Sequence, residues 1–253
     1  LLALVLSGGA LRVGRAASLL VPVMSLLYLV FCFVILLARA PALPGVFRLI
    51  LESAFSPRAA LGGTAGIGFL TTFRVGLSRG VFSHEAGLGT SAIAHSGAEG
   101  ISPQDQGLFG VFEVFFDALL CTLTGLTVLV SGITMPYGDA SLNSTLVINA
   151  FSTRFSPALA AVFIAVSLLL FAFTSMTTFA LYGARCAEFL FGSHVQKIYY
   201  VVFLLVTILG ALLPRSAAWE IGELLNAAMS IPNLTAMALL VRRVPQLKDA
   251  LQK

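Results

Sequence analysis

The chain has 253 residues, of which 58% are hydrophobic and 10% are charged, and its formal net charge is +4. Soluble globular proteins contain about 25% charged residues, so this composition predicts an integral membrane protein instead. The positive charges are scattered singly between apolar segments, without the basic stripe of nucleic-acid-binding proteins, so no nucleic acid is expected as a partner. The three cysteines lack CxxC spacing and predict neither a disulfide framework nor a zinc site.

Long apolar stretches recur along the chain, and they are continuous rather than alternating, which predicts membrane-spanning helices in a lipid bilayer. Residues 1–6 resemble the end of a span, residues 7–17 a short loop, and residues 18–38 a full span. Because the chain begins inside an apolar run, we expect it to be the C-terminal part of a longer protein, whose N-terminal helices would be its partners.

Prolines at positions 41 and 44 predict a helix-breaking exit from this span, because proline lacks a backbone donor and restricts the residue before it. Residues 46–55 then form a short amphipathic segment suited to the membrane interface. Residues 60–98 do not fit one span, since a helix of that length would extend about 58 Å, nearly twice the bilayer core. Two helical pieces separated by irregular backbone are predicted there.

Further spans are predicted at residues 106–131, 157–181, 197–213 and 219–241, after a polar loop at residues 102–105. The sequence Ser230-Ile-Pro-Asn233 interrupts the last span, and we interpret it as a kink rather than a site. Trp219 and the pair Tyr199-Tyr200 suit interfacial positions. Lys and Arg are slightly more frequent on the side of the C-terminal tail, which predicts a cytoplasmic C-terminus.

The segment Phe82-Ser-His-Glu-Ala-Gly-Leu-Gly-Thr-Ser-Ala-Ile-Ala-His95 combines polar side chains and glycines within a membrane-like sequence. An ionisable residue at bilayer depth usually faces a partner, a cavity or a pathway. Gly87 and Gly89 would allow a helix break, whose free backbone groups, together with Thr90 and the serines, would bind a zwitterion or cation. Close packing of helices through small residues is the alternative. The carboxylate of Glu85 favours the binding site, because packing does not require it.

A metal centre is not expected, because His84 and His95 are eleven positions apart and match no metal-binding spacing. His95 is interpreted as a hydrogen-bonding group at a helix interface. Enzyme signatures are also missing from the sequence: it has no Walker loop, no GxGxxG and no GxSxG. A serine–histidine intramembrane hydrolase built on Ser83 and His95 stays a minor alternative, since their spacing is not diagnostic.

Two more polar groups lie inside predicted spans. The segment Phe171-Ala-Phe-Thr-Ser-Met-Thr-Thr-Phe179 offers hydroxyls that could bind sodium, although such hydroxyls often bond back to the carbonyl four residues earlier. Its residues Ser175 and Phe179 are one turn apart and therefore share a helix face. Glu113 and Asp117 form a like-charge pair at i,i+4, which repels unless it is neutralised, and Arg74 and Arg79 are the expected partners.

The stretch Gly80-Val-Phe-Ser-His-Glu-Ala-Gly-Leu-Gly-Thr-Ser-Ala-Ile-Ala-His95 resembles the signature of the alanine-or-glycine:cation symporter family, the sodium:alanine symporters. Residues 110–122 are similar to the family's next helix. Phe171-Ala-Phe-Thr-Ser175, Arg185-Cys-Ala-Glu188 and Ile231-Pro-Asn-Leu234 match later family segments in the right order. The resemblance covers nearly the whole chain.

This resemblance implies the leucine-transporter-like fold of the amino acid–polyamine–cation superfamily, which has two inverted five-helix repeats. It implies sodium-coupled symport of alanine or glycine by alternating access in the cell (inner) membrane, with Na⁺ as the coupling ion and no other cofactor. Residues 1–38 would end the first repeat, and residues 39–253 would hold the second repeat and the tail. The substrate would contact Ala86, Gly87, Leu88, Gly89, Thr90, Ser175 and Phe179, and sodium would contact Thr174 and Ser175.

The chain also departs from the family pattern. His84 stands where many members have asparagine, and Phe179 stands where an indole is usual, so the preferred amino acid is open. Two alternatives to transport remain: a truncated product that does not transport, and the intramembrane enzyme.

Overall fold

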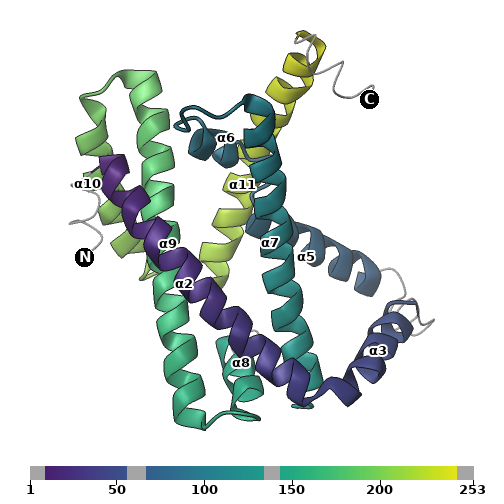
Figure 1. Ribbon diagram of the computed structural model, residues 1–253. Helices are drawn as coiled ribbons and strands as arrows, with labels where there is room; N and C mark the ends of the chain where they lie inside the picture. The colour runs from purple at the N-terminus through teal and green to yellow at the C-terminus, as the bar shows by residue number, and fades with distance from the viewer. Residues whose placement is uncertain (1–8, 56–66, 134–142, 244–253) are drawn as a thin grey trace. The chain divides into compact units, whose positions relative to one another are not determined.

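The computed structural model describes residues 9–55, 67–133 and 143–243 (Figure 1). Every regular element in these ranges is a helix, which confirms the prediction of an all-α protein. Four helical stretches are long and apolar enough to cross a membrane, namely Ser18–Ala38, Pro103–Val130, Pro157–Phe191 and Ser216–Arg242.

The first described helix, α2, spans Gly9–Ala38 and contains the predicted span. The expected loop is wrong over residues 9–17, which are helical, because good helix formers such as Ala, Leu and Arg outweigh one glycine there. The expected span end at residues 1–6 lies outside the described residues. A 3₁₀ turn, Ala40–Ala42, then leads into α3, Leu43–Phe55, so the predicted proline break and short helix are confirmed.

The chain divides into two compact units, residues 1–70 with 116–184 and residues 71–115 with 185–253. We call them unit 1 and unit 2. Helices α7, Pro103–Val130, and α9, Pro157–Phe191, each contribute residues to both. The division therefore follows the packing of helix segments rather than whole helices.

Unit 1 has an aromatic core where α2 crosses α9 obliquely (Figure 1). The rings of Phe31 and Phe163 stack with centroids 3.9 Å apart and planes 7° from parallel. Phe151, fully buried beside them, comes from α8, Asn143–Ser152. Helix α8 was not predicted, because its ten residues are too short to span a bilayer and contain no long apolar run.

Unit 2 contains most of α5, Ile67–His84, together with α6, Thr90–His95, α10, Val195–Gly210, and α11, Arg215–Arg243. An aromatic and charged contact joins α5 to α11. Phe82 packs on Trp219 with ring centroids 5.1 Å apart, and the Arg79 guanidinium lies 4.0 Å from the centre of the same indole. Arg79 also approaches Glu223, with Nη2 and Oε1 3.3 Å apart.

The predicted interruption of the last span is wrong, because α11 continues through Pro232. A proline removes one backbone donor from the helix ladder, and the hydrogen bonds on either side of it can preserve the helix. Helix α9 also extends beyond its predicted end at residue 181 and reaches Phe191. It ends at Gly192, whose φ of +88° is a conformation that glycine adopts readily at helix ends.

Candidate functional site

A break between two helices lies at the centre of the polar, glycine-containing segment Phe82–His95. Helix α5 ends at His84, and α6 begins at Thr90. Gly87 and Gly89 between them have φ of +85° and +89°, and Glu85 also has a positive φ, +51°. The predicted irregular backbone, and the two glycines as the residues that permit it, are therefore confirmed.

Helix α11 holds this break through one side chain. The amide Nδ2 of Asn233 donates a hydrogen bond of 2.8 Å to the carbonyl oxygen of Gly87. The other amide atom, Oδ1, lies 2.9 Å from the point where a Cβ on residue 89 would stand. Leu234 approaches the Cβ position of residue 87 to 3.4 Å. Any side chain at position 89 would therefore displace Asn233.

The interpretation of Ser230-Ile-Pro-Asn233 as a kink thus overlooked a residue that contacts the candidate site. Periodicity could not identify Asn233, because its partner lies 146 positions away in the sequence. A signal was nevertheless present, since Ile231-Pro-Asn-Leu234 is one of the segments that resemble the family pattern. Its asparagine supplies the hydrogen bond.

Two buried residues border the break on its α6 side. Leu88 is 5% exposed and Thr90 is 4% exposed. Within the described part of the chain, the Thr90 hydroxyl oxygen has no hydrogen-bond partner. On the α5 side, His84 Nδ1 donates to the Gly80 carbonyl at 2.8 Å, so this imidazole secures the end of α5. Thr90 is thus a buried polar side chain at the α6 side of the break whose hydroxyl no described residue satisfies.

The predicted residues of α9 lie on two sides of the helix. Thr174 is buried within unit 1, and its hydroxyl donates to the carbonyls of Leu170 and Phe171, each at 3.0 Å. Ser175 is exposed, and Phe179, one turn later, is 44% exposed, so their predicted common face is confirmed. A hydroxyl that donates its proton to a carbonyl keeps its oxygen lone pairs for a cation.

The predicted site residues belong to both units. Ala86, Gly87, Leu88, Gly89 and Thr90 lie in unit 2, and the α9 residues Thr174, Ser175 and Phe179 lie in unit 1. Their joining into one site therefore remains a prediction.

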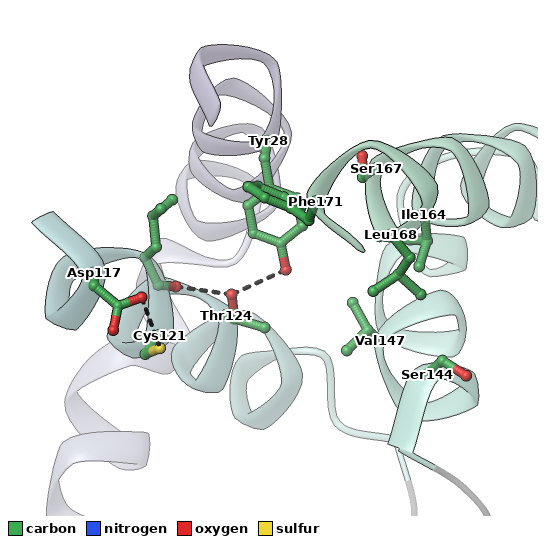
Figure 2. A pocket seen from close by; sticks show the side chains of 11 residues that line it. Tyr28, Asp117, Cys121, Thr124, Ser144, Val147, Ile164, Ser167, Leu168 and Phe171 are labelled. Atoms are coloured by element: carbon green, nitrogen blue, oxygen red, sulfur yellow. Dashed lines mark hydrogen bonds between the residues drawn. The ribbon is translucent and has the colours of Figure 1, made fainter. Parts of the chain in front are cut away.

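Unit 1 also contains a cavity of about 410 Å³ between α2, α7, α8 and α9 (Figure 2). One wall is polar: the Tyr28 hydroxyl donates to Thr124 Oγ1 at 2.9 Å, and Thr124 donates to the Leu120 carbonyl at 2.8 Å. Asp117 lies on the same helix as Thr124, and Cys121 Sγ is 4.0 Å from its Oδ1. None of the predicted site residues lines this cavity.

Glu113 of α7 lies beside a histidine in the described residues, and not beside one of the two arginines expected as its partners. Glu113 Oε1 lies 3.3 Å from His95 Nε2, whereas Arg79 interacts with Glu223. The prediction is wrong because it used nearness in sequence, while the packing of α6 on α7 brings His95 to Glu113. The predicted hydrogen bond of His95 across a helix interface is confirmed by Gln106, whose Nε2 donates to His95 Nδ1 at 2.8 Å.

Metal ligands are not grouped in the described residues, where no three His, Cys, Asp or Glu side chains are placed to hold an ion. A sodium ion would instead depend on hydroxyl and carbonyl oxygens, the donors that hard cations prefer.

Comparison with known proteins finds one family and several relatives that match all or nearly all of the chain. The model of the sodium:alanine symporter family matches residues 1–253. The chain is 35% identical over 239 residues to an uncharacterized transporter of Haemophilus influenzae, covering 94% of this chain and 52% of that protein. It is 33% identical over 239 residues to the sodium/alanine symporter AgcS of Methanococcus maripaludis, with coverage of 94% and 52%.

A further relative is the amino-acid carrier protein AlsT of Bacillus subtilis, which is 32% identical over 242 residues, covering 95% of this chain and 50% of that protein. The chain therefore spans about half the length of the curated relatives it matches.

Proposed function

Because the chain belongs to the sodium:alanine symporter family, we propose that it forms part of a sodium-coupled symporter for a small neutral amino acid, alanine or glycine. The observation that carries this proposal is the interrupted helix at residues 85–89, which Asn233 of α11 holds open. The names of two relatives, a sodium/alanine symporter and an amino-acid carrier, support the same class of activity.

The amino acid would bind at the break, against Ala86, Gly87, Leu88, Gly89 and Thr90. Backbone amides and carbonyls that leave the helix ladder offer donors to a carboxylate and acceptors to an ammonium group, so the break suits a zwitterion. The buried Thr90 hydroxyl adds a group that can donate or accept. The small space at Gly87 and Gly89 favours a substrate with a short side chain.

Sodium would bind at Thr174 and Ser175 of α9, and Ser175 and Phe179 would also border the substrate. The geometry of Thr174 supports this role, because its proton is already donated to backbone carbonyls and its oxygen can face a cation. Sodium would then order the region where the substrate binds. Sodium binding and substrate binding would therefore be coupled.

The whole transporter would have the leucine-transporter-like fold and work by alternating access, with residues 1–38 ending the first repeat and residues 39–253 forming the second repeat and a cytoplasmic tail. The N-terminal helices would supply the other half of both sites. The length of the chain, about half that of its relatives, supports this division. A family of transporters also favours transport over the intramembrane enzyme.

Reconstitution tests the proposal. The full-length protein is placed in liposomes, and uptake of labelled alanine and glycine is measured with an inward sodium gradient, with potassium in its place, and without a gradient. We expect accumulation above equilibrium only with the sodium gradient. Uptake indifferent to sodium would contradict the coupling, and chemical conversion of the amino acid would favour an enzyme.

A further inference from the structure

The cavity of unit 1 is lined by none of the residues assigned to the proposed transport site. Its lining residues all belong to unit 1, so the packing of this unit alone defines it. Its volume of about 410 Å³ lies within the range of about 300–1,000 Å³ that is typical of small-molecule sites in proteins. The cavity is therefore large enough for a ligand, and the chemistry of its walls indicates which class of ligand.

Much of the cavity wall is apolar. Aliphatic side chains from α8 and α9 gather on one side of the cavity in Figure 2, namely Val147, Ile164 and Leu168. Tyr28 and Phe171 add two aromatic rings, whose centroids are 6.4 Å apart and whose planes are 82° from parallel. Aliphatic side chains favour an apolar group by the hydrophobic effect, and the faces of aromatic rings attract cations. This part of the wall suits the apolar body of a ligand that also carries a positive charge.

The polar part of the wall offers hydrogen-bond acceptors. The Tyr28 hydroxyl donates to Thr124 Oγ1 at 2.9 Å, and the Thr124 hydroxyl in turn donates to the Leu120 carbonyl at 2.8 Å. Both protons are therefore used within the wall, and the hydroxyl oxygens keep lone pairs for a further hydrogen bond. Such a wall suits a ligand that donates protons, as an ammonium group does.

The charge of the cavity has one sign. Among the described residues that line it, Asp117 alone is charged, and it lies with Cys121 on the side of Thr124 away from the aliphatic residues (Figure 2). A carboxylate has about four acceptor positions, so Asp117 can bind an ammonium group in addition to the contacts it already makes, such as that to Cys121 Sγ at 4.0 Å. An ionisable residue within a predicted span typically marks a functional site, and a negative one favours a cation.

We propose that this cavity is a binding site for small organic cations, with the ammonium group between Asp117 and Thr124 and an aromatic or branched aliphatic body against the apolar wall. The substrate of the proposed function is a poor ligand here, because the carboxylate of an amino acid would lie close to Asp117. The cavity thus shares neither residues nor ligand with the transport site. Neither its geometry nor its charge depends on the proposed function.

Cys121 in the cavity wall reports whether the cavity is occupied. The purified full-length protein is treated with N-ethylmaleimide at neutral pH and increasing phenethylamine, and alkylation of each cysteine is followed by peptide mass spectrometry. This amine is charged, since alkylammonium groups such as that of lysine have a pKa of about 10.4. We expect alkylation of Cys121 to be about tenfold slower when phenethylamine is at about ten times its Kd. Cys186, which is also exposed but does not line the cavity, should react at an unchanged rate.

Two analogues of the amine test the role of charge. Phenethyl alcohol is neutral, and hydrocinnamate is an anion. We expect the alcohol to bind about tenfold more weakly than the amine, because it lacks the hydrogen bond between two charged groups, and hydrocinnamate to give no protection. Asp117→Asn should lower the affinity for the amine to that for the alcohol and leave the affinity for the alcohol unchanged, which also shows that the cavity is intact. Glu113→Gln, a matched change one turn earlier on α7 and outside the cavity wall, should behave as the wild type.

Each part of the proposal has its own contradicting result. If N-ethylmaleimide does not reach Cys121, or if phenethylamine does not slow its alkylation, the site is overturned; a cavity filled by other helices of the full-length protein would give the first result. Equal protection by amine and alcohol, unchanged in Asp117→Asn, would overturn the preference for a cation.

A second variant tests the position of the ligand. Leu168, which is 51% exposed, lines the cavity, and Leu168→Trp should fill it and remove protection by both the amine and the alcohol. Protection that persists would place the amine elsewhere. None of these measurements requires transport, so a failure of the proposed function would appear separately, as a loss of sodium-driven uptake in the liposome assay.

Discussion

At the scale of single residues, the candidate site depends on the contact between Asn233 and the broken backbone. Asn233 satisfies the partly buried Gly87 carbonyl, which has left the helix ladder and would be costly to leave without a partner. The same side chain occupies the space beside Gly89. The conformation of the break thus depends on one amide as well as on two glycines.

Replacing Asn233 by Asp tests this contact. The carboxylate has the same shape, but it cannot donate to the Gly87 carbonyl and would repel it. We expect the KM for alanine to rise about tenfold, which corresponds to one hydrogen bond of about 1.4 kcal/mol. Thr235→Val is the control on the same helix, because the Thr235 hydroxyl donates to the carbonyl of Ile231 in its own helix. An unchanged KM in Asn233→Asp would exclude Asn233 from the site.

The proposed sodium ligand Thr174 gives a second residue-scale prediction. Thr174→Ala should raise the sodium concentration for half-maximal uptake about tenfold, since it removes one oxygen ligand of a cation, with a smaller loss in maximal uptake. The matched control is Thr207→Ala in α10, where the hydroxyl makes the same bond to the carbonyl four residues earlier. A loss of maximal uptake with unchanged sodium dependence would place sodium elsewhere.

At the scale of helices, α5 and α11 are joined by side chains as well as by the backbone contact at the break. Arg79 stacks on Trp219 and approaches Glu223, while Phe82 lies against the same indole and 3.3 Å from the Cβ position of Gly222. Arg79 and Phe82 lie within the last one and a half turns or so of α5, which ends at His84. This cluster therefore fixes the helix that leads into the break.

A double-mutant cycle measures this helix contact. We expect Arg79→Ala and Glu223→Ala to be coupled in the thermal unfolding of the detergent-solubilised protein by about 0.5–1 kcal/mol, because both side chains are partly exposed. Arg79→Lys should recover less than half of the loss, since an ammonium stacks poorly on indole. The exposed pair Arg48 and Glu52 on α3 is the control and should show weaker coupling. Equal coupling in both pairs would contradict a special role for the α5–α11 contact.

At the scale of the whole molecule, features that depend on composition and chain length could be predicted from the sequence. Continuous apolar runs predicted the long helices, and the excessive length of residues 60–98 predicted the break. Contacts between distant segments could not be predicted in this way, because periodicity shows which face of a helix is apolar but not which helix covers it. Glu113 therefore received the wrong partner, and Asn233 was overlooked.

The helix boundaries that were predicted wrongly have local physical explanations. Pro232 does not end α11, because the loss of a single donor does not outweigh the hydrogen bonds around it. Residues 9–17 are helical although a loop was predicted there. The candidate site could be predicted in part, because the glycines of the break can be identified in the sequence. That residues of units 1 and 2 bind one substrate together is still a prediction.

The most direct test of the central claim is alanine binding by the full-length protein carrying Gly89→Ala. Residue 89 has φ of +89°, and an added Cβ would stand 2.9 Å from Asn233 Oδ1, so alanine there should deform the break. The control is Gly76→Ala in α5, where an added Cβ meets no described atom within 4 Å. In sodium-containing buffer we predict that Gly89→Ala loses alanine binding while Gly76→Ala keeps it. Binding of wild-type affinity by Gly89→Ala would contradict the account.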